Sequence, residues 1–418
     1  MAEAANKATA LWVIRHLRQA GFTALLAGGC VRDMLLGVRS SDYDVATDAT
    51  PRQVKRLFRR VLLVGAKFGV AMVLHRRRKV EVTTFRSDES YTDGRRPDSV
   101  RYTKPREDAK RRDFTINGMF YDPADDRVID YIGGRKDLAA GVVRTIGSAD
   151  RRFAEDYLRM LRAVRFSVRL GFRIVPATAA AIRKRAPKIT SISGERIFDE
   201  LSRMLAHPAA GEALRKLEEL GLARHVLPEL FAPRSRWRAS VERVSAVAKR
   251  RDLTLALGAL LLDVPPTDIR RIVRRFGASN ELRDALCLMA ERHDEWRRAA
   301  EMPLHTFKRL MASRHFERMR RLWRLEEKRE TARQTQSWRI ARRANGIAPA
   351  EVSPKPLIGG ADLMALGVAE GPRLGAILRT VRNAQLDERI HTRDEAIRLA
   401  RASLQRKGSF VAGGAEEG

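Results

Sequence analysis

Short runs of alternating apolar and polar residues mark the first third of the chain. Where such runs are bounded by Gly, Pro, Asn or Asp, they predict strands with one buried face. The sequence predicts five of them: Thr23–Ala27, Asp42–Thr47, Val70–Leu74, Val80–Phe85 and Val128–Ile132. We therefore expect residues 1–147 to form an α/β domain.

From Arg151 onward, strand patterns almost vanish and apolar residues recur at the spacing of amphipathic helices. Glycine and proline interrupt this pattern where helices are expected to end. These interruptions fall at Gly171, Pro187, Gly221, Pro228, Pro265 and Gly277. A segment rich in Gly and Pro, residues 345–360, predicts a linker before C-terminal helices that end near Leu404. The expected fold class is an α/β head followed by all-α domains.

The composition of the chain indicates several domains and the kind of partner that it binds. A chain of 418 residues exceeds the size of a single core, so several domains are expected. Lys and Arg total 82 against 51 for Asp and Glu, which gives a net charge of +31. Such an excess favours a phosphate-rich partner, although arginines that only decorate helix surfaces explain part of it.

The sequence disfavours a membrane protein. It contains no apolar run of the roughly 18 residues that a spanning helix needs, and residues 1–21 lack the apolar segment of a signal peptide. Only Cys30 and Cys287 are present, too few and too distant for a disulfide framework or a cysteine-based zinc site. We expect a cytoplasmic protein that does not bind a membrane and has no disulfide-linked partner.

A Gly-Gly turn follows the first predicted strand. Gly28 and Gly29 lead into a helix start that carries Arg32 in its first turn. Such a turn brings backbone N–H groups close to a phosphate, and Arg32 would add positive charge. A strand-to-helix turn also needs glycine for purely steric reasons, so both interpretations stay open at this point.

Two carboxylates, Asp42 and Asp44, follow this turn. At positions i and i+2 of a strand they share one face, about 6.5 Å apart. Because two such anions repel each other, they call for a cation, and Mg²⁺ beside a triphosphate suits an oxygen-only site. Such a site would activate an RNA 3′-hydroxyl and neutralise a leaving pyrophosphate. Glu81, on another predicted strand, is a candidate third metal ligand.

Four ordered motifs make the chain resemble one family. They are Gly28–Asp33 with Asp42-Tyr43-Asp44, then Arg111–Asn117, then Glu155–Phe166, and then Ser193–Ile197. In this order they resemble class II tRNA nucleotidyltransferases, the CCA-adding enzymes, and the related bacterial poly(A) polymerases. The resemblance covers about half of the chain closely and implies a head of the nucleotidyltransferase (polymerase beta-like) type. It implies four domains: a catalytic head (1–147), a nucleotide-selecting neck (148–205), a body (206–344) and a linker with an RNA-binding tail (345–418).

The resemblance also implies how the base is chosen. Residues 153–168 have the apolar stripe of one amphipathic helix, with Glu155, Arg159 and Arg162 on another face. In this family an Asp-Arg couple on the helix reads the Watson–Crick edge, which carries over to Asp156 and Arg159. A carboxylate that only accepts suits the exocyclic amine of C or A, and Arg159 can donate to the adjoining ring nitrogen.

Further arginines are expected at the nucleotide. Arg162, Arg165 and Arg112 are candidates for contacts to the triphosphate or the base. Residues 308–343 carry Arg or Lys at nearly every turn, with Trp323 and Trp338 between them. That segment suits RNA phosphates and stacking, and a solvated helix with core tryptophans explains it equally well.

The predicted activity is template-independent addition of C and A to the 3′ end of tRNA, from CTP and ATP with Mg²⁺. Residues 86–106 resemble the mobile basic loop that assists the change from C to A in this family, which argues against an enzyme that adds C only. Residues 64–69 resemble the tRNA enzymes more than the polyadenylating ones. A poly(A) polymerase or an A-adding tRNA enzyme is the alternative, and a non-catalytic RNA-binding protein is a remote one.

Overall fold

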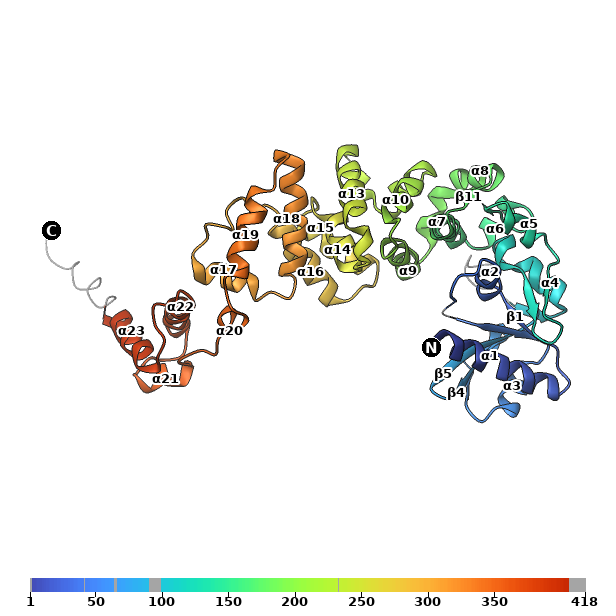
Figure 1. Ribbon diagram of the computed structural model, residues 1–418, viewed down its shortest axis with the longest axis horizontal. Coiled ribbons are helices and arrows are strands. Elements are labelled where there is room, and N and C mark those ends of the chain that lie inside the picture. The colour runs from blue at the N-terminus through green and yellow to red at the C-terminus, as the bar shows by residue number, and fades with distance from the viewer. Residues whose placement is uncertain (1, 41, 64–65, 90–98, 232, 406–418) are drawn as a thin grey trace, which may run out of the picture. The chain divides into compact units, whose positions relative to one another are not determined.

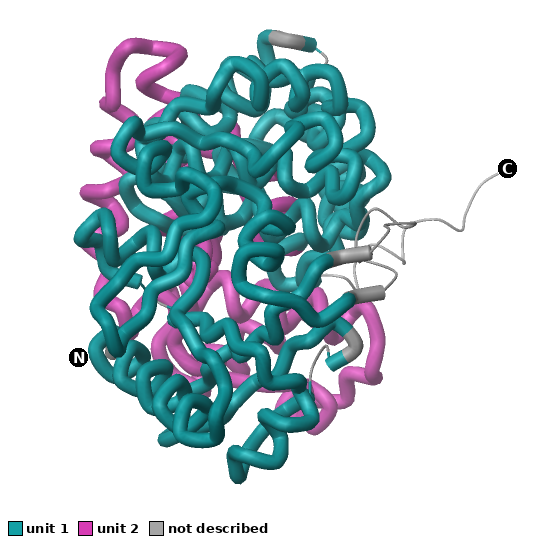
Figure 2. Tube along the Cα trace, turned by 90° about the vertical axis from the view of Figure 1, so that its right-hand side faces the viewer, with its two compact units in different colours: residues 1–283 teal, residues 284–418 magenta. Residues whose placement is uncertain are grey.

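The computed structural model describes residues 2–40, 42–63, 66–89, 99–231 and 233–405. Two compact units, residues 1–283 and 284–418, make up the chain (Figure 2).

The first unit begins with a seven-stranded mixed sheet in the order β3-β4-β5-β2-β1-β8-β9. Strands β2 and β5 are parallel, and every other neighbouring pair in this sheet is antiparallel. The elements of this region are α1 Ala2–Gln19, β1 Ala24–Ala27, α2 Gly29–Leu35, β2 Asp44–Thr47, α3 Pro51–Leu57, β3 Val61–Leu62, β4 Val70–His75, β5 Arg78–Thr84, β6 Arg86–Glu89, β7 Ser99–Tyr102, α4 Pro105–Arg111, β8 Phe120–Asp122, β9 Arg127–Ile129, α5 Gly134–Ala139 and β10 Val142–Val143.

The two faces of this sheet differ. Leu25, Ala46 and Phe120 belong to a buried cluster with Ala109 of α4. Because directly paired residues share a face, Asp44, which pairs with Ala27, lies on this α4 side. The apolar residues of α1 are buried on the opposite side, where α1 and α3 lie together beside the strands (Figure 1).

The strand predictions are largely confirmed. Four of the five predicted runs become β1, β2, β4 and β5, with ends shifted by one or two residues. Two details were wrong. Asp42 precedes β2 instead of belonging to it, and β9 ends at Ile129 because Asp130 folds into a turn, where its carboxylate accepts backbone N–H groups from Ile132 and Gly134. The short strand β8 was not predicted.

Helices form the rest of the first unit, apart from β11, which pairs in parallel with β10. Gly171 ends α7 and Gly277 follows α15, both with positive φ, as the breaks in the pattern predicted. The elements are α6 Ala149–Glu155, α7 Leu158–Leu170, β11 Arg173–Ile174, α8 Pro176–Arg185, α9 Gly194–Leu205, α10 Ala210–Glu219, α11 Ala223–Val226, α12 Pro228–Phe231, α13 Arg234–Val247, α14 Leu253–Leu261, α15 Pro266–Arg275 and the start of α16 Asn280–Glu291.

The second unit is helical. Its elements are the end of α16, α17 Leu304–Met311, α18 Phe316–Thr331, α19 Thr335–Asn345, α20 Pro349–Val352, α21 Gly360–Ala365, α22 Pro372–Leu386 and α23 Arg393–Gln405. The predicted linker therefore contains the single turn α20. Trp323 is buried and donates its indole N–H to the carbonyl of Arg292, whereas Trp338 is 61% exposed. One tryptophan is a core residue and the other is available at the surface.

Within the described ranges, no helix is long and apolar enough to cross a bilayer. Both cysteine side chains are buried.

Candidate active site

Most of the residues that the sequence motifs predicted as site residues line one pocket of about 450 Å³ in the first unit. Ten of the eleven predicted site residues line it, and Glu81 lies outside the lining. The ten are Gly28, Gly29, Arg32, Asp42, Asp44, Arg112, Asp156, Arg159, Arg162 and Arg165.

The Gly-Gly turn is sterically required. Gly28 has a φ of +76°, and a Cβ there would lie 2.9 Å from Nη1 of Arg112. Helix α2 begins at Gly29, directly beside the pocket. The steric interpretation therefore holds on its own, and contact of this turn with phosphate stays a prediction.

The acidic pair faces this turn. Loss of solvent, followed by the negative charges of Glu81 and Asp42, raises the pKa of Asp44 to about 6, although Arg112 opposes the shift. Glu81 is close because Val45 pairs with Val82 in parallel register, so the preceding residues, Asp44 and Glu81, are also neighbours. The charged form of Asp44 is thus disfavoured by its burial and by the two neighbouring carboxylates.

Among the residues that the structure describes, no group of three or more carboxylate, histidine or cysteine side chains is placed to hold one metal ion. Asp42 and Asp44 offer two carboxylates. Glu81 adds charge beside Asp44, and its assignment as a third ligand stays a prediction.

Arg32 is held inside the wall of the pocket. It is 2% exposed and donates to Oδ1 of Asp33 at 2.7 and 2.8 Å and to Oδ1 of Asn117 at 2.5 Å. Its guanidinium also lies 5.1 Å from the centre of the Phe166 ring. Burial lowers the pKa of Arg32, and Asp33 counteracts that shift. The side chain is a fixed cation of the wall, not a mobile one.

Arg112 connects the carboxylates to helix α4. Its Nε and Nη2 donate to Oδ2 of Asp108 at 3.2 and 3.0 Å, and Nη1 donates to the carbonyl of Asn117. The attraction of Arg112 and Arg111 holds the pKa of buried Asp108 below its usual value. An arginine has five N–H donors, so these contacts leave it capable of holding an anion in the pocket.

The predicted single helix over residues 153–168 is wrong. The structure ends α6 at Glu155 and starts α7 at Leu158, and Asp156 adopts an extended conformation (φ −154°, ψ 105°) between them. The Asp156 carboxylate accepts the backbone N–H of Leu158 at 3.0 Å, which stabilises the start of α7. Apolar spacing continued across this break, so periodicity alone could not reveal it.

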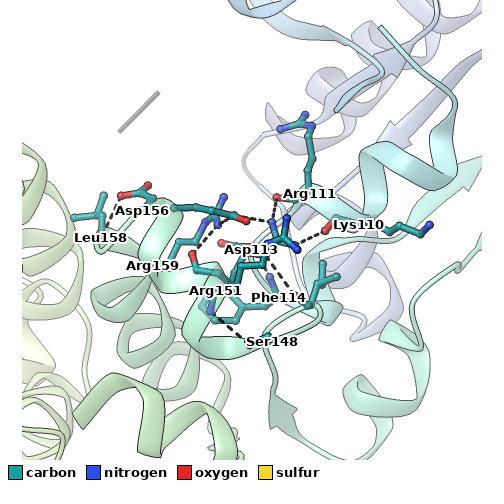
Figure 3. Close-up of polar contacts among 12 residues, drawn as sticks. Lys110, Arg111, Asp113, Phe114, Ser148, Arg151, Asp156, Leu158 and Arg159 are labelled. Atoms are coloured by element: carbon teal, nitrogen blue, oxygen red, sulfur yellow. Dashed lines mark hydrogen bonds and ion pairs between the residues drawn. The ribbon is translucent and has the colours of Figure 1, made fainter. Parts of the chain in front are cut away.

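Asp156, in the break, and Arg159, in the first turn of α7, both line the pocket, and the close-up shows both side chains (Figure 3). Arg159 donates to Glu155 at 2.6 Å, which confirms the predicted proximity of these two residues. Oδ2 of Asp156 accepts from Nη2 of Arg196 at 2.8 Å. The candidate base-reading groups are therefore positioned before any nucleotide binds.

Helix α6 is attached to the end of α4 through Arg152. Its guanidinium donates to the carbonyls of Lys110 and Arg111 at 2.7 and 3.2 Å. The same side chain pairs with Glu155 at 2.8 Å. Helices α4 and α6 beside the pocket are thus directly bonded.

Two further arginines of α7 are held by acids. Arg162 pairs with Asp113 at 2.6 Å and Arg165 with Glu200 at 2.5 Å. Both guanidinium groups lie over the ring of Phe166, 5.3 and 4.3 Å from its centre. Burial opposes ionisation of Asp113, yet the charge of Arg162 and hydrogen bonds from Asn117 and Arg162 hold its pKa at about 2.

Sequence reasoning missed most of these partners. Asp113 and Asn117 stood inside a quoted motif without a role, and so did Arg196. Nη1 of Arg196 is buried and has no hydrogen-bond partner among the described residues, which makes it available to a ligand. Glu200 gave no signal, because an acid on a helix is usually a solvated residue.

Two segments used for prediction are only partly described. Residues 90–98 of the basic segment 86–106, and residues 64 and 65 of the segment 64–69, lie outside the described residues.

Comparison with known proteins matches this architecture in three consecutive parts. Residues 24–144 match the family model described as "Poly A polymerase head domain". Residues 171–232 match "Probable RNA and SrmB- binding site of polymerase A", and residues 249–400 match tRNA nucleotidyltransferase domain 2. The CCA-adding enzyme of Geobacillus kaustophilus is 41% identical over 276 residues, which are 66% of this chain and 67% of that enzyme.

The chain belongs to the family of CCA-adding enzymes and bacterial poly(A) polymerases.

Both branches of this family are similar to the chain, to different extents. Poly(A) polymerase I of Salmonella typhi is 41% identical over 232 residues, which span 53% of this chain and 50% of that enzyme. The crystal structure of the Bacillus stearothermophilus CCA-adding enzyme in complex with CTP is similar over 96% of this chain and 98% of that one. Its TM-score is 0.75 at 29% sequence identity. Likeness to the CCA-adding branch thus extends through the helical domains.

Proposed function

We propose that this protein adds C and A to the 3′ end of tRNA from CTP and ATP, with release of pyrophosphate. The observation that carries the proposal is the single pocket that joins Asp42 and Asp44 to Asp156 and Arg159. Paired carboxylates serve phosphoryl transfer, and an Asp-Arg couple serves recognition of a base edge. A protein that only binds RNA has no use for paired anions that face an anionic ligand.

The donor set of the pocket fits Mg²⁺. Asp42 and Asp44 would supply two carboxylate ligands, and a divalent cation bound there would offset the repulsion of Asp44 by Glu81 and Asp42. Mg²⁺ commonly takes one or two carboxylates and completes its shell with water and substrate phosphates. When bound, the ion would make the RNA 3′-hydroxyl a better nucleophile and neutralise charge on the leaving pyrophosphate.

The protein's own groups position the other reactants. Arg112, next to Gly28 and Asp44, would hold the triphosphate close to the carboxylates. Asp156 would accept the exocyclic amine of C or A while Arg159 donates to the ring nitrogen. U and G present the opposite donor and acceptor pattern and would leave both groups unpaired, which is how a protein without a template excludes them.

The choice of CCA addition over polyadenylation rests on the extent of similarity. By sequence, the Geobacillus kaustophilus CCA-adding enzyme aligns with 66% of this chain and the Salmonella typhi poly(A) polymerase with 53%. The solved structure of a CCA-adding enzyme in complex with CTP is similar over 96% of the chain. A pocket whose acceptor suits cytosine as well as adenine agrees with this choice. We propose that the protein acts in the cytoplasm, where CTP, ATP and tRNA would be available to it.

The deciding experiment uses three tRNA transcripts that end before the CCA, after C and after CC. Purified protein with Mg²⁺ receives CTP and ATP, singly and together, and product lengths are read on a sequencing gel. We expect ordered addition that stops at CCA. Addition of A only after CC, or a long A tract on any RNA, would replace the proposal with the A-adding or polyadenylating alternative.

A further inference from the structure

A second pocket lies on the head sheet, away from the candidate active site. It has a volume of about 600 Å³ and shares no lining residue with the first pocket. Its lining comes from α1, the segment after α3, and the hairpin of β4 and β5.

This pocket is on the reverse face of the sheet. Asp44 and its neighbour Glu81 lie on the α4 side, because they are in register with each other and with Ala27. Val73 lines the second pocket and pairs with Val80, which alternates with Glu81 along β5 and so faces the α1 side. A ligand in this pocket would therefore leave the catalytic carboxylates untouched.

Aromatic side chains form one wall of the pocket. Trp12 stacks on His75 with 3.8 Å between ring centres and 17° between ring planes. Phe58 lies 5.5 Å from Trp12, and His16 lies 4.1 Å from it. Trp12, His16 and His75 are each partly exposed, so this wall offers ring surface to a ligand.

Cations surround the aromatic wall without acids to balance them. Six basic residues line the pocket, and none of its described lining residues is acidic. Arg78 donates to Asn6 at 3.0 Å, whereas Arg59, Arg60, Arg76, Arg77 and Lys79 have no ion pair or side-chain hydrogen bond with any described residue.

Some surface arginines of the chain have an acidic partner. Arg203 pairs with Asp199 at 3.1 Å and Arg320 with Glu317 at 2.8 Å, both at helical spacing. The five cations named above lack such a partner among the described residues. Unbalanced cations that converge on one cavity repel one another, and an anion in that cavity relieves the repulsion.

The hairpin turn adds an independent observation. Arg76 and Arg77 form the two-residue connection between His75 and Arg78, with φ of 45° and 62°. Positive φ at both positions favours Asn-Gly in such a turn and strains other side chains. Both positions of this turn are occupied by arginine, although the backbone there favours Asn and Gly. Residues held in such a strained conformation cluster at ligand-binding sites.

We propose that this reverse-face pocket binds a single-stranded segment of RNA. The arginines of the turn and Arg59, Arg60 and Lys79 would hold its phosphates, and a base would pack against the aromatic wall. The choice of RNA rests on the proposed function, whereas the presence of an anion site does not.

The test uses the full chain and a fluorescent 15-nucleotide oligouridylate whose 3′ end is blocked, with 4-thiouridine for photocrosslinking. The variant Arg76→Asn/Arg77→Gly removes both charges and gives the turn its preferred residues, so its melting temperature should not fall. The matched control, Arg52→Gln/Arg56→Gln, removes two exposed charges of α3 that do not line the pocket.

We expect crosslinks in the peptides that contain Trp12 or residues 75–79. The turn variant should lower the slope of log affinity against log salt by about 1.4, since each phosphate contact to a single strand contributes about 0.7. The control should change the slope by less than half as much. Equal changes in both variants, crosslinks confined to the first pocket, or binding of tripolyphosphate without binding of RNA would each overturn the proposal.

The same preparations are assayed for C and A addition to tRNA. The turn variant should add nucleotides to a short acceptor stem at the wild-type rate, because its residues lie outside the first pocket. If wild-type protein adds no nucleotides yet shows the crosslinks and the slope change, the proposed function fails and the RNA site stands.

Discussion

Oδ2 of Asp113 accepts a hydrogen bond from Nε of Arg162 at 2.8 Å and lies 2.6 Å from Nη2 in the same ion pair. Asp113 lies two residues after the end of helix α4, whereas Arg162 belongs to α7, the helix after the Asp156 break. A carboxylate in the same pocket lining as Asp42 and Asp44 is thus bonded to α7.

Replacing Asp113 by Asn tests this connection. The amide keeps the shape but loses the charge that holds Arg162, and breaking a buried charged hydrogen bond costs about 2 kcal/mol. We expect the free energy of unfolding to fall by that amount and kcat/KM for CTP and ATP to fall by about tenfold. Asp125→Asn, at an exposed loop pair of 3.9 Å, is the control and should change neither quantity.

The ion pair of Asp113 and Arg162 also predicts how the free energy of unfolding depends on pH. The pKa of Asp113 is about 2 in the folded protein, below the value near 4 of an unfolded chain. Its stabilisation is therefore complete above about pH 4 and is lost as pH falls toward 2. In urea titrations from pH 5 to pH 2, the difference in unfolding free energy between wild type and Asp113→Asn should shrink. A difference that stays constant over this range would contradict the assignment.

Asp42→Ala tests the metal assignment. Loss of one of two carboxylate ligands should reduce nucleotide addition by at least about 10³-fold, because the metal stabilises charge that develops in the reaction. Binding of tRNA, followed by fluorescence anisotropy, should stay within about twofold. Removal of divalent ions with EDTA should abolish addition by wild type and re-addition of Mg²⁺ should restore it. Substantial residual activity of Asp42→Ala would remove this residue from the site.

Asp156→Asn tests base selection. An amide can donate as well as accept, so it tolerates the carbonyl that U presents where C has an amine. We expect preference for CTP over UTP to fall by at least about tenfold, a loss of about 1.4 kcal/mol of discrimination. Because Asp156 also holds Arg196, the variant Arg196→Lys serves as control, and it should slow addition without admitting UTP.

Gly194 gives a prediction on stability alone. A Cβ at this position would overlap the carbonyl oxygen of Arg275, so the start of α9 packs directly on the end of α15. Gly194→Ala should lower the free energy of unfolding of this unit by about 2 kcal/mol, as overpacking in a core does. Gly375→Ala, inside α22 with only a flexible arginine nearby, should leave the protein equally stable or slightly more so. Melting curves of both variants provide the comparison.

The sequence predicted the strands and the pocket residues well for a physical reason. Gly28, Asp42 and Asp44 are confined to short motifs, where local backbone geometry and charge already restrict what the residues can do. The acidic partners of the pocket arginines are distant in sequence. Glu200, for example, accepts a hydrogen bond from Arg165, which is 35 residues away, and no local sequence pattern indicates such a contact.

The break at Asp156 shows the opposite limit. No glycine or proline marks it, and the apolar residues on either side keep helical spacing, as Phe153 and Leu161 illustrate. What ends α6 is a tertiary contact, the bond between Asp156 and Arg196 of α9, together with the capping of Leu158. A competing interaction from elsewhere in the fold therefore overrides the local preference for helix.

The pairing of β10 with β11 has a consequence for how such proteins can be recombined. These strands join residues 142–143 to residues 173–174 across the expected boundary at residue 147, and Arg152 and Arg162 bond across it as well. A crossover at that boundary would separate segments that pair and bond with each other, so we expect such a chimera to be less stable than one joined beyond residue 205. The proposed metal-binding residues and the proposed nucleotide-selecting residues therefore belong to one folded block.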